Sequence, residues 1–310
     1  MELIEGVSLS RLCDYSFGDQ SGKCGCDIYT SFMKDANVSN LEFYNKVQEI
    51  KKERDYMTLF IDNIRLYKRD IKDVKPQDKS YVNSLMAKSD LLKLCSHFSN
   101  MRFIIFTNLE DTSIDEYIHD LIPENVLCIS AVNAVAHGGK VIAAPYGVQR
   151  RLHPNDNRIE NIKKLMENTP PVKKLLYVSH NDGTHHERIG IKDLFVNKSW
   201  ASVNYNRADH LTFMKNICEH KFTICPRGNA VDGGHRNYEV LYVRRVPVMK
   251  QHPYLEELYK DYPVLFVDNF TDITEQLLID NENLYEEAQI MDLSKWTLPN
   301  YYDTIVNEYK

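Results

Sequence analysis

Two arginines, a histidine and an aspartate lie among three glycines in the stretch CPRGNAVDGGHR, residues 225–236. Guanidinium groups carry forked N–H donors that match the oxygens of a phosphate. Glycine lets the main chain approach a ligand closely, and the helix expected after this stretch offers free N–H groups and a partial positive charge. The pattern predicts a diphosphate site. Its candidate contacts are Arg227, Gly228, Asn229, His235 and Arg236.

Glu239 lies three residues after Arg236, so both side chains share one face of the expected helix. A carboxylate at that place suits the two neighbouring hydroxyls of a ribose. Structural interpretations stay open for each residue. Arg227 suits a salt bridge at a strand end, Arg236 and Glu239 suit a surface ion pair, His235 suits a cap or a core position, and Asp232 suits a turn.

The segment SHNDGTHHERIG, residues 179–190, is a second polar loop that follows an apolar run and enters a helical pattern. Arg188 is a candidate third contact to phosphate, with a solvent-facing role as the alternative. Thr184 is a candidate ligand contact. It equally suits a helix cap, with Glu187 three residues later completing a capping box.

Short apolar runs alternate with amphipathic stretches along the whole chain, which is typical of parallel α/β structure. In the first half we expect strands at 57–62, 102–107, 125–130 and 140–145, with helices at 41–52, 82–98 and 113–121. In the second half we expect strands at 174–179, 200–205, 222–225, 246–249 and 264–267. The helices expected there are 185–195, 210–220, 235–245, 254–262 and 271–280.

Residues 150–172 form a proline-punctuated connection with a short charged helix between the prolines. The expected organisation is two Rossmann-like domains, an N-terminal one over 1–150 and a C-terminal one over 151–292; the predicted diphosphate site lies in the second. Residues 293–310 form a terminal helix, broken by Pro299, that packs back on the first domain. Ligands of such sheets bind beyond the carboxyl ends of the strands.

Composition and charge exclude several classes of protein. The net charge of −6 and a pI near 6.0 argue against broad nucleic-acid binding, which needs a basic face. No run approaches the roughly 18 apolar residues of a membrane span, and the start lacks the pattern of a signal peptide. The 7 cysteines are scattered, which favours a reduced, cytoplasmic compartment. Their odd number, together with the ordinary Met1 start, favours a bacterial or viral protein. Cys24 and Cys26 lack the second pair of ligands that a zinc site needs.

The block CPRGN, an aspartate, HR, a helical glutamate and an apolar VPV strand resembles the C-terminal half of exostosin-like glycosyltransferases. The segment LLYVSHNDGTHHER and the ending YLEELYKDYPVLFVDNFTDIT resemble that family as well, so the likeness covers residues 170–290. DYSFGDQ and NAVAHGGKVIAAPYGVQR match it loosely. The chain departs from the family at Ala230, where a second glycine is usual, and at Tyr238, where tryptophan is usual.

The resemblance implies a GT-B architecture, in which two Rossmann-like domains face a cleft. It also implies a nucleotide-sugar donor, a glycan acceptor, and inverting transfer without an essential metal or other cofactor. The residues agree on the metal: no Asp-x-Asp follows an apolar strand, and the nearest stretch, Asn155–Asn157, lies in the polar connection. The leaving diphosphate then needs arginines and a helix end for stabilisation.

Inverting transfer needs a general base that takes the proton from the acceptor hydroxyl. In a GT-B enzyme this base comes from the first domain. Asp19 lies in a glycine-containing loop, Asp62 ends an expected strand, and His137 precedes two glycines. We rank Asp19 and His137 level and Asp62 behind them, with a turn position as the alternative for His137.

The leading hypothesis is a glycosyltransferase with a UDP-sugar donor, for which UDP-xylose, UDP-galactose and UDP-glucuronate all stay open. A GDP-fucose enzyme of the GT-B type is a related hypothesis. A non-catalytic protein that binds a nucleotide or a glycan is the alternative from another class. A phosphotransferase is disfavoured, because the sequence lacks a Walker-type phosphate loop.

Overall fold

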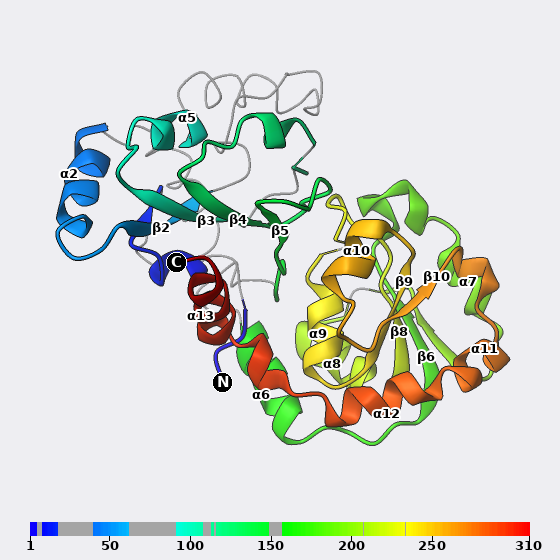
Figure 1. Cartoon of the computed structure of the whole chain (residues 1–310). Coiled ribbons are helices and arrows are strands. Elements are labelled where there is room, and N and C mark those ends of the chain that lie inside the picture. The colour runs from blue at the N-terminus through cyan, green and yellow to red at the C-terminus, as the bar shows by residue number, and fades with distance from the viewer. Residues whose placement is uncertain are drawn as a thin grey trace. The chain divides into compact units, whose positions relative to one another are not determined.

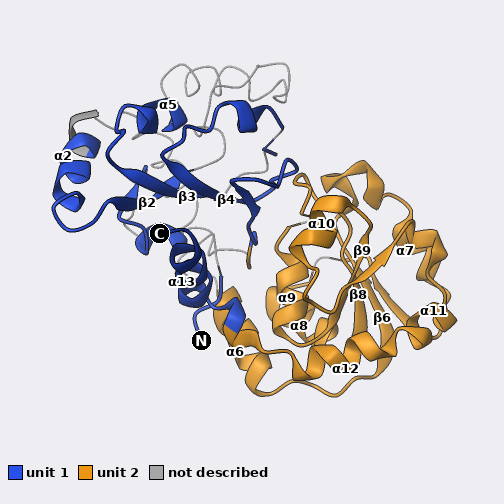
Figure 2. Cartoon of the chain, viewed as in Figure 1, with its two compact units in different colours: residues 1–146, 152–154, 295–310 blue, residues 147–151, 155–294 orange. Residues whose placement is uncertain are grey.

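The computed structural model describes most of the chain. The described residues are 1–4, 8–17, 40–61, 91–107, 113–114, 116–148, 157–206, 208–232 and 234–310. The chain divides into two compact units, which Figure 2 colours separately. Unit 1 contains Met1–Tyr146, Leu152–Pro154 and Lys295–Lys310, and unit 2 contains Gly147–Arg151 and Asn155–Ser294.

Unit 1 is built on a sheet of parallel strands. The strands are β1 (Tyr15–Ser16), β2 (Tyr56–Ile61), β3 (Arg102–Thr107), β4 (Val126–Ala131) and β5 (Val141–Ala143). Their order in the sheet is β1-β2-β3-β4-β5, which is their order along the chain. In β2 and β3 every residue after the first is buried, as expected of parallel strands covered on both faces.

Helical segments cover this sheet. They are η1 (Ser8–Arg11), α2 (Asn40–Ile50), α5 (Leu91–Ser96), η3 (Glu116–Asp120) and α13 (Leu298–Tyr309). The 3-10 segment η7 (Leu293–Trp296) precedes α13, at the point where the chain passes from unit 2 to unit 1. The last helix packs Leu298, Ile305 and Val306 into one apolar cluster with residues of β2, β3 and β4. Pro299 lies in the first turn of α13, where its missing N–H costs nothing, so it starts this helix and does not break it.

Unit 2 is built on a second five-stranded parallel sheet. Its strands are β6 (Lys174–Ser179), β7 (Ala201–Asn204), β8 (His220–Ile224), β9 (Val246–Lys250) and β10 (Leu265–Val267). The order is β10-β9-β8-β6-β7. The chain therefore leaves β6 toward one edge of the sheet, returns to β8 on the other side of β6, and continues to the opposite edge. The switch point lies between β6 and β8.

Helices cover both faces of this second sheet (Figure 1). They are α6 (Arg158–Glu167), α7 (Ile191–Phe195), α8 (His210–Cys218), α9 (Arg236–Tyr242), α10 (Pro253–Leu258), α11 (Glu275–Asp280) and α12 (Glu282–Ile290). Leu176 and Val178 of β6 pack against α7, α11 and α12. Tyr177 points to the opposite face, where it contacts Phe213 and Asn216 of α8.

The α/β class and the two Rossmann-like units of the GT-B prediction are confirmed. The nine strands expected from the sequence are present, with ends within about three residues of the expected ones. The helix expected over 113–121 is a single 3-10 segment, η3, and the one expected over 185–195 is a 3-10 segment followed by α7. In the described part of the chain, no helix combines the length and the apolarity of a membrane span. The cleft between the units stays a prediction.

Candidate functional site

The two loops that the sequence singled out leave neighbouring strands at the switch point of the second sheet. Residues 180–190 follow the carboxyl end of β6, and residues 225–235 follow the carboxyl end of β8. In sheets with this strand order, ligands bind beyond the carboxyl ends of the two strands that flank the switch point. The topology therefore brings both polar loops to the edge where a ligand is expected.

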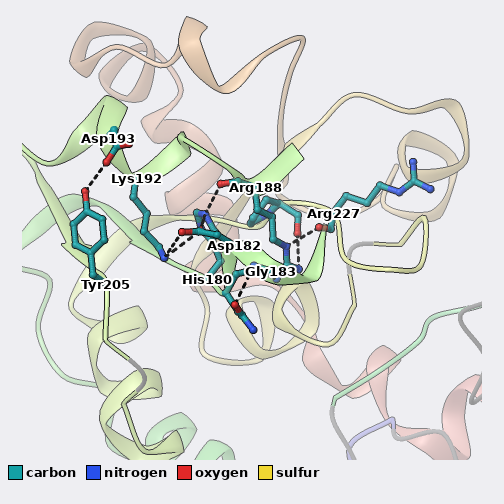
Figure 3. Close-up of polar contacts among 10 residues, drawn as sticks. His180, Asp182, Gly183, Arg188, Lys192, Asp193, Tyr205 and Arg227 are labelled. Atoms are coloured by element: carbon teal, nitrogen blue, oxygen red, sulfur yellow. Dashed lines mark hydrogen bonds and ion pairs between the residues drawn. The ribbon is translucent and has the colours of Figure 1, made fainter. Parts of the chain in front are cut away.

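Arg188 ties the two loops together (Figure 3). Its Nε donates to the main-chain oxygen of Arg227 at 2.7 Å and its Nη2 to that of Pro226 at 3.1 Å. Its Nη1 donates to the oxygen of Asn181 at 3.3 Å, within its own loop. Arg188 is only 7% exposed, so the solvent-facing alternative is wrong. All three nitrogen atoms of its guanidinium group donate to main-chain oxygens, so the group does not extend into solvent.

The other two arginines each have a donor atom without a hydrogen-bond partner among the described residues. Arg227 and Arg236 are half-buried, and the Nε atom of each is buried without a hydrogen-bond partner among the described residues. Arg236 begins α9, and its guanidinium carbon lies 5.5 Å from the centre of the Phe213 ring. Buried donors are normally paired, so two unpaired guanidinium donors mark a place where a ligand can supply acceptors.

The positive charges of this cluster affect their neighbours. Burial lowers the pKa of Arg188 to about 10, and the charge of Arg236 adds to this effect. Burial also lowers the pKa of His180 to about 4, with further lowering by Arg236 and Lys192. His180 is therefore neutral at physiological pH and adds no charge. The arginines create a positive potential that favours a multiply charged anion.

Beside the arginines lies a network that the sequence analysis missed. Nζ of Lys192 donates to Oδ2 of Asp182 at 3.3 Å and lies 3.1 Å from its Oδ1. Nε2 of His180 lies 3.1 Å from the same Oδ1 and 3.1 Å from the main-chain oxygen of Arg188, with which it forms a hydrogen bond. The Lys192 side chain is only 6% exposed, and its ammonium group lies 5.4 Å from the centre of the Tyr205 ring. The hydroxyl of Tyr205 donates to Asp193 at 2.9 Å (Figure 3). Lys192 and Asp182 balance each other, so the excess charge stays on the arginines.

Glu239 lies on the first turns of α9 and is 5% exposed. Its Oε1 lies 3.2 Å from Nε2 of His210, at the start of α8. Glu239 thus pairs with a neighbouring helix instead of forming the surface pair with Arg236 that was the structural alternative. Nδ1 of His235, at the N-cap position of α9, donates to the main-chain oxygen of Gly147 at 2.9 Å. The His235 side chain makes no capping hydrogen bond to α9, so the capping interpretation of its side chain is wrong.

A buried carboxylate anchors the glycine-containing loop. Asp232 is fully buried and accepts hydrogen bonds from the hydroxyls of Tyr238 at 2.7 Å and Tyr259 at 2.9 Å. Asn237 donates to the main-chain oxygen of Asp232 at 2.6 Å. Asp232 is therefore more than the turn residue of the sequence alternative, and it holds the loop from the protein side. Within this loop Gly228 is buried and Asn229 is exposed.

The capping box expected of Thr184 and Glu187 is absent. The loop instead contains two short 3-10 segments, η4 (Asp182–Thr184) and η5 (His186–Arg188). Their caps are Asn181, whose Oδ1 accepts from the N–H of Gly183, and His185, whose Nδ1 accepts from the N–H of Glu187. Thr184 is half-buried at the end of η4, and a contact to a ligand stays a prediction for it.

Of the three candidates for the base, Asp19 and Asp62 lie outside the described residues. His137 is half-buried in the loop between β4 and β5. It precedes a tight turn in which Gly138 and Val141 exchange main-chain hydrogen bonds of 2.8 and 2.9 Å. The choice of base stays a prediction.

Among the described residues, His185, His186 and Glu187 offer ligand atoms within 4.8 Å of one another. These are consecutive residues of the loop after β6, and the charge of Arg227 lies near His185. The metal-free hypothesis stays a prediction. Cys24 and Cys26 lie outside the described residues.

No family model matches the chain, and no curated protein matches it. Among solved structures, the chain is similar to an alpha,alpha-trehalose 6-phosphate synthase from Burkholderia multivorans. The identity is 12%, the TM-score is 0.36, and the match covers 93% of this chain and 77% of that chain. At this level of identity and TM-score the likeness says nothing about the site, so the function is inferred from the site's own residues.

Proposed function

We propose that the chain is an inverting glycosyltransferase that moves a sugar from a nucleotide diphosphate donor to a hydroxyl of a glycan. The observation that carries this proposal is the arginine cluster at the switch point of the second sheet. Arg188 and Arg227 belong to the two loops there, Arg236 begins the helix that follows, and Nε of Arg227 and of Arg236 is buried without a partner in the described chain. A diphosphate supplies several acceptor oxygens and negative charges to such a cluster.

In the proposed reaction the acceptor oxygen attacks the anomeric carbon while the bond from that carbon to the diphosphate oxygen breaks. A general base takes the proton of the acceptor hydroxyl, and the leaving nucleotide diphosphate keeps the bonding electrons. Arg227 and Arg236 stabilise the charge that develops on the leaving group. Glu239 binds the ribose hydroxyls, for which its place three residues after Arg236 is suited. No metal is needed for these steps.

UDP-sugars are the favoured donors, with UDP-xylose as one example, and GDP-fucose is the related alternative. This preference comes from the resemblance of residues 170–290 to exostosin-like enzymes. A panel of UDP, GDP, CMP and their sugars, read by thermal shift, separates these donors, because a ligand that binds only the folded state raises the melting temperature.

The same panel, followed by an assay of nucleotide release, separates an enzyme from a binding protein. An enzyme releases UDP from its sugar donor when a glycan acceptor is added. A non-catalytic binder is stabilised by UDP and releases none from any donor with any acceptor. Absence of a shift with every nucleotide contradicts the donor site itself.

A further inference from the structure

The two peptide groups that follow Pro226 and Arg227 both turn their carbonyl oxygens toward Arg188. The distances are 3.1 Å to the oxygen of Pro226 and 2.7 Å to that of Arg227. The described chain has no cis peptide bonds, and in a planar trans peptide the N–H points opposite to the C=O. The N–H groups of Arg227 and Gly228 belong to these two peptide groups. They therefore point away from Arg188.

These two N–H groups are open donors. Neither makes a hydrogen bond with any residue that the structure describes. Gly228 is buried, and a buried N–H without a partner costs about 1–3 kcal/mol, so such groups are rare. Figure 3 shows the Arg227 side chain also extending away from Arg188. The two main-chain N–H donors and the guanidinium group of Arg227 therefore all point to the side of this turn that lies opposite Arg188.

Arg188 itself is poorly placed for direct contact with a phosphate. It is 7% exposed, and Nε and both Nη atoms already donate to main-chain oxygens. None of the ion pairs in the described chain includes it. Burying a cation without a carboxylate partner costs free energy, so an arginine at this position must make a contribution that offsets this cost. Its geometry offers one, because a planar fork can hold two successive carbonyl groups at once.

We propose that Arg188 is a positioning residue that arranges a main-chain anion site. It fixes the peptide groups after Pro226 and Arg227, so that the N–H groups of Arg227 and Gly228 bind the oxygens of the diphosphate. The inference rests on the proposed function, because that function supplies the diphosphate. It assigns the direct contacts to main-chain atoms and to the side chain of Arg227, and it gives Arg188 an indirect role.

The test is Arg188→Lys, with UDP and inorganic pyrophosphate as ligands and calorimetry as the measurement. Lysine keeps the positive charge but has one ammonium group, which cannot reproduce the fork that holds both carbonyls. If Arg188 acts through geometry, the affinity for both ligands falls roughly tenfold or more, as for loss of a charged hydrogen bond. Affinity equal to that of the wild type overturns the proposal.

Arg245→Lys is the matched control. Arg245 is 2% exposed and also donates to main-chain oxygens, among them those of Cys218 and Pro170. It precedes β9 and so lies at the amino end of that strand, opposite to the candidate site. The control is expected to lower the melting temperature as Arg188→Lys does, with unchanged affinity for UDP. Equal losses of affinity in both variants indicate a general structural effect and overturn the positioning role.

A measurement on the wild type tests the main-chain anion site even if Arg188→Lys fails to fold. The amide resonances of Arg227 and Gly228 are expected to shift on addition of pyrophosphate, because their N–H groups gain an acceptor. If pyrophosphate binds and these two amide resonances do not shift, the main-chain site is wrong and the proposed function stands. If neither pyrophosphate nor UDP binds, the proposed function fails, and this inference fails with it.

Discussion

The Nε atoms of Arg227 and Arg236 carry the strongest residue-level evidence for a ligand. Each is buried without a hydrogen-bond partner among the described residues. A buried donor normally finds a partner, and a charged donor loses more than a neutral one when it does not. An anion with several oxygens satisfies both side chains, and it also balances the charge that Arg188 adds beside them.

We expect Arg227→Ala and Arg236→Ala each to weaken binding of UDP by about 1.5–3 kcal/mol, the usual range for a lost hydrogen bond to a charged group. Isothermal calorimetry measures the change. Lys215→Ala, on the exposed surface of α8, is the control that removes a positive charge away from the arginine cluster. Affinities that stay at the wild-type value in both arginine variants sink the assignment of this site.

His180 gives a pH-dependent contribution to stability. Its pKa of about 4 lies below the ordinary value of 6.5, mainly because of burial. Between these two pH values the unfolded chain binds a proton that the folded chain does not bind, so stability falls as the pH falls from 6.5 toward 4. The expected loss is at most about 3 kcal/mol.

Thermal unfolding from pH 7 to pH 4 tests this contribution. The melting temperature of the wild type should fall more steeply than that of His180→Gln, so that the two curves converge at low pH. His97→Gln changes an exposed histidine and should keep the wild-type slope. Parallel curves for the wild type and His180→Gln contradict the assignment.

The sequence identifies the arginines as candidate phosphate contacts, but it does not show which atoms each of them contacts. Arg188 looks like Arg227 in the sequence, and only the pairing of β6 with β8 brings it against the main chain after Pro226. Lys192 and His180 carry no local signal either, because their shared partner Asp182 is visible only once the loop folds. Contacts between segments about 40 residues apart, such as Arg188 with Arg227, are set by the sheet order.

The strands could be predicted from the sequence more reliably than the structure of the loop after β6. Strands of a parallel sheet are continuous apolar runs bounded by polar loops, so β3 and β6 are readable to the residue. The loop after β6 was misread, because Thr184 and Glu187 have the spacing of a capping box. There Asn181 and His185 cap the two 3-10 segments instead. Several side chains in that loop compete for the same N–H groups, and spacing alone does not choose among them.

That loop also holds the three consecutive residues whose atoms lie close enough to bind a metal ion, His185 to Glu187. If the arginines alone stabilise the leaving diphosphate, EDTA should leave the release of nucleotide nearly unchanged. An assay of UDP release with and without EDTA measures this. Loss of activity that Mn²⁺ restores overturns the metal-free mechanism, and loss of the Mn²⁺ response in His186→Ala then identifies this loop as the metal site.

For the whole molecule, the two sheets differ in a way that bears on function. The second sheet has a switch point between β6 and β8, and the candidate donor site lies there. The described strands of the first sheet follow one another in chain order, so the described part of that sheet offers no corresponding switch point. Strand order is the property that a single sequence reveals least, because each crossover is chosen by long-range packing. The sequence therefore predicts a donor site from the residue types of two loops, while the placement of those loops at a switch point is known only from the structure.

The general base is therefore sought among the residues of unit 1. His137→Ala and Asp19→Asn should each be compared with the wild type for turnover and for affinity of the donor. Loss of the base slows proton removal from the acceptor, so turnover falls, typically by about 10²–10⁴-fold, while the affinity for UDP stays the same. Asp62→Asn serves as the third member of the series. A variant that loses affinity and turnover together does not identify the base, and full turnover in all three places the base at another residue.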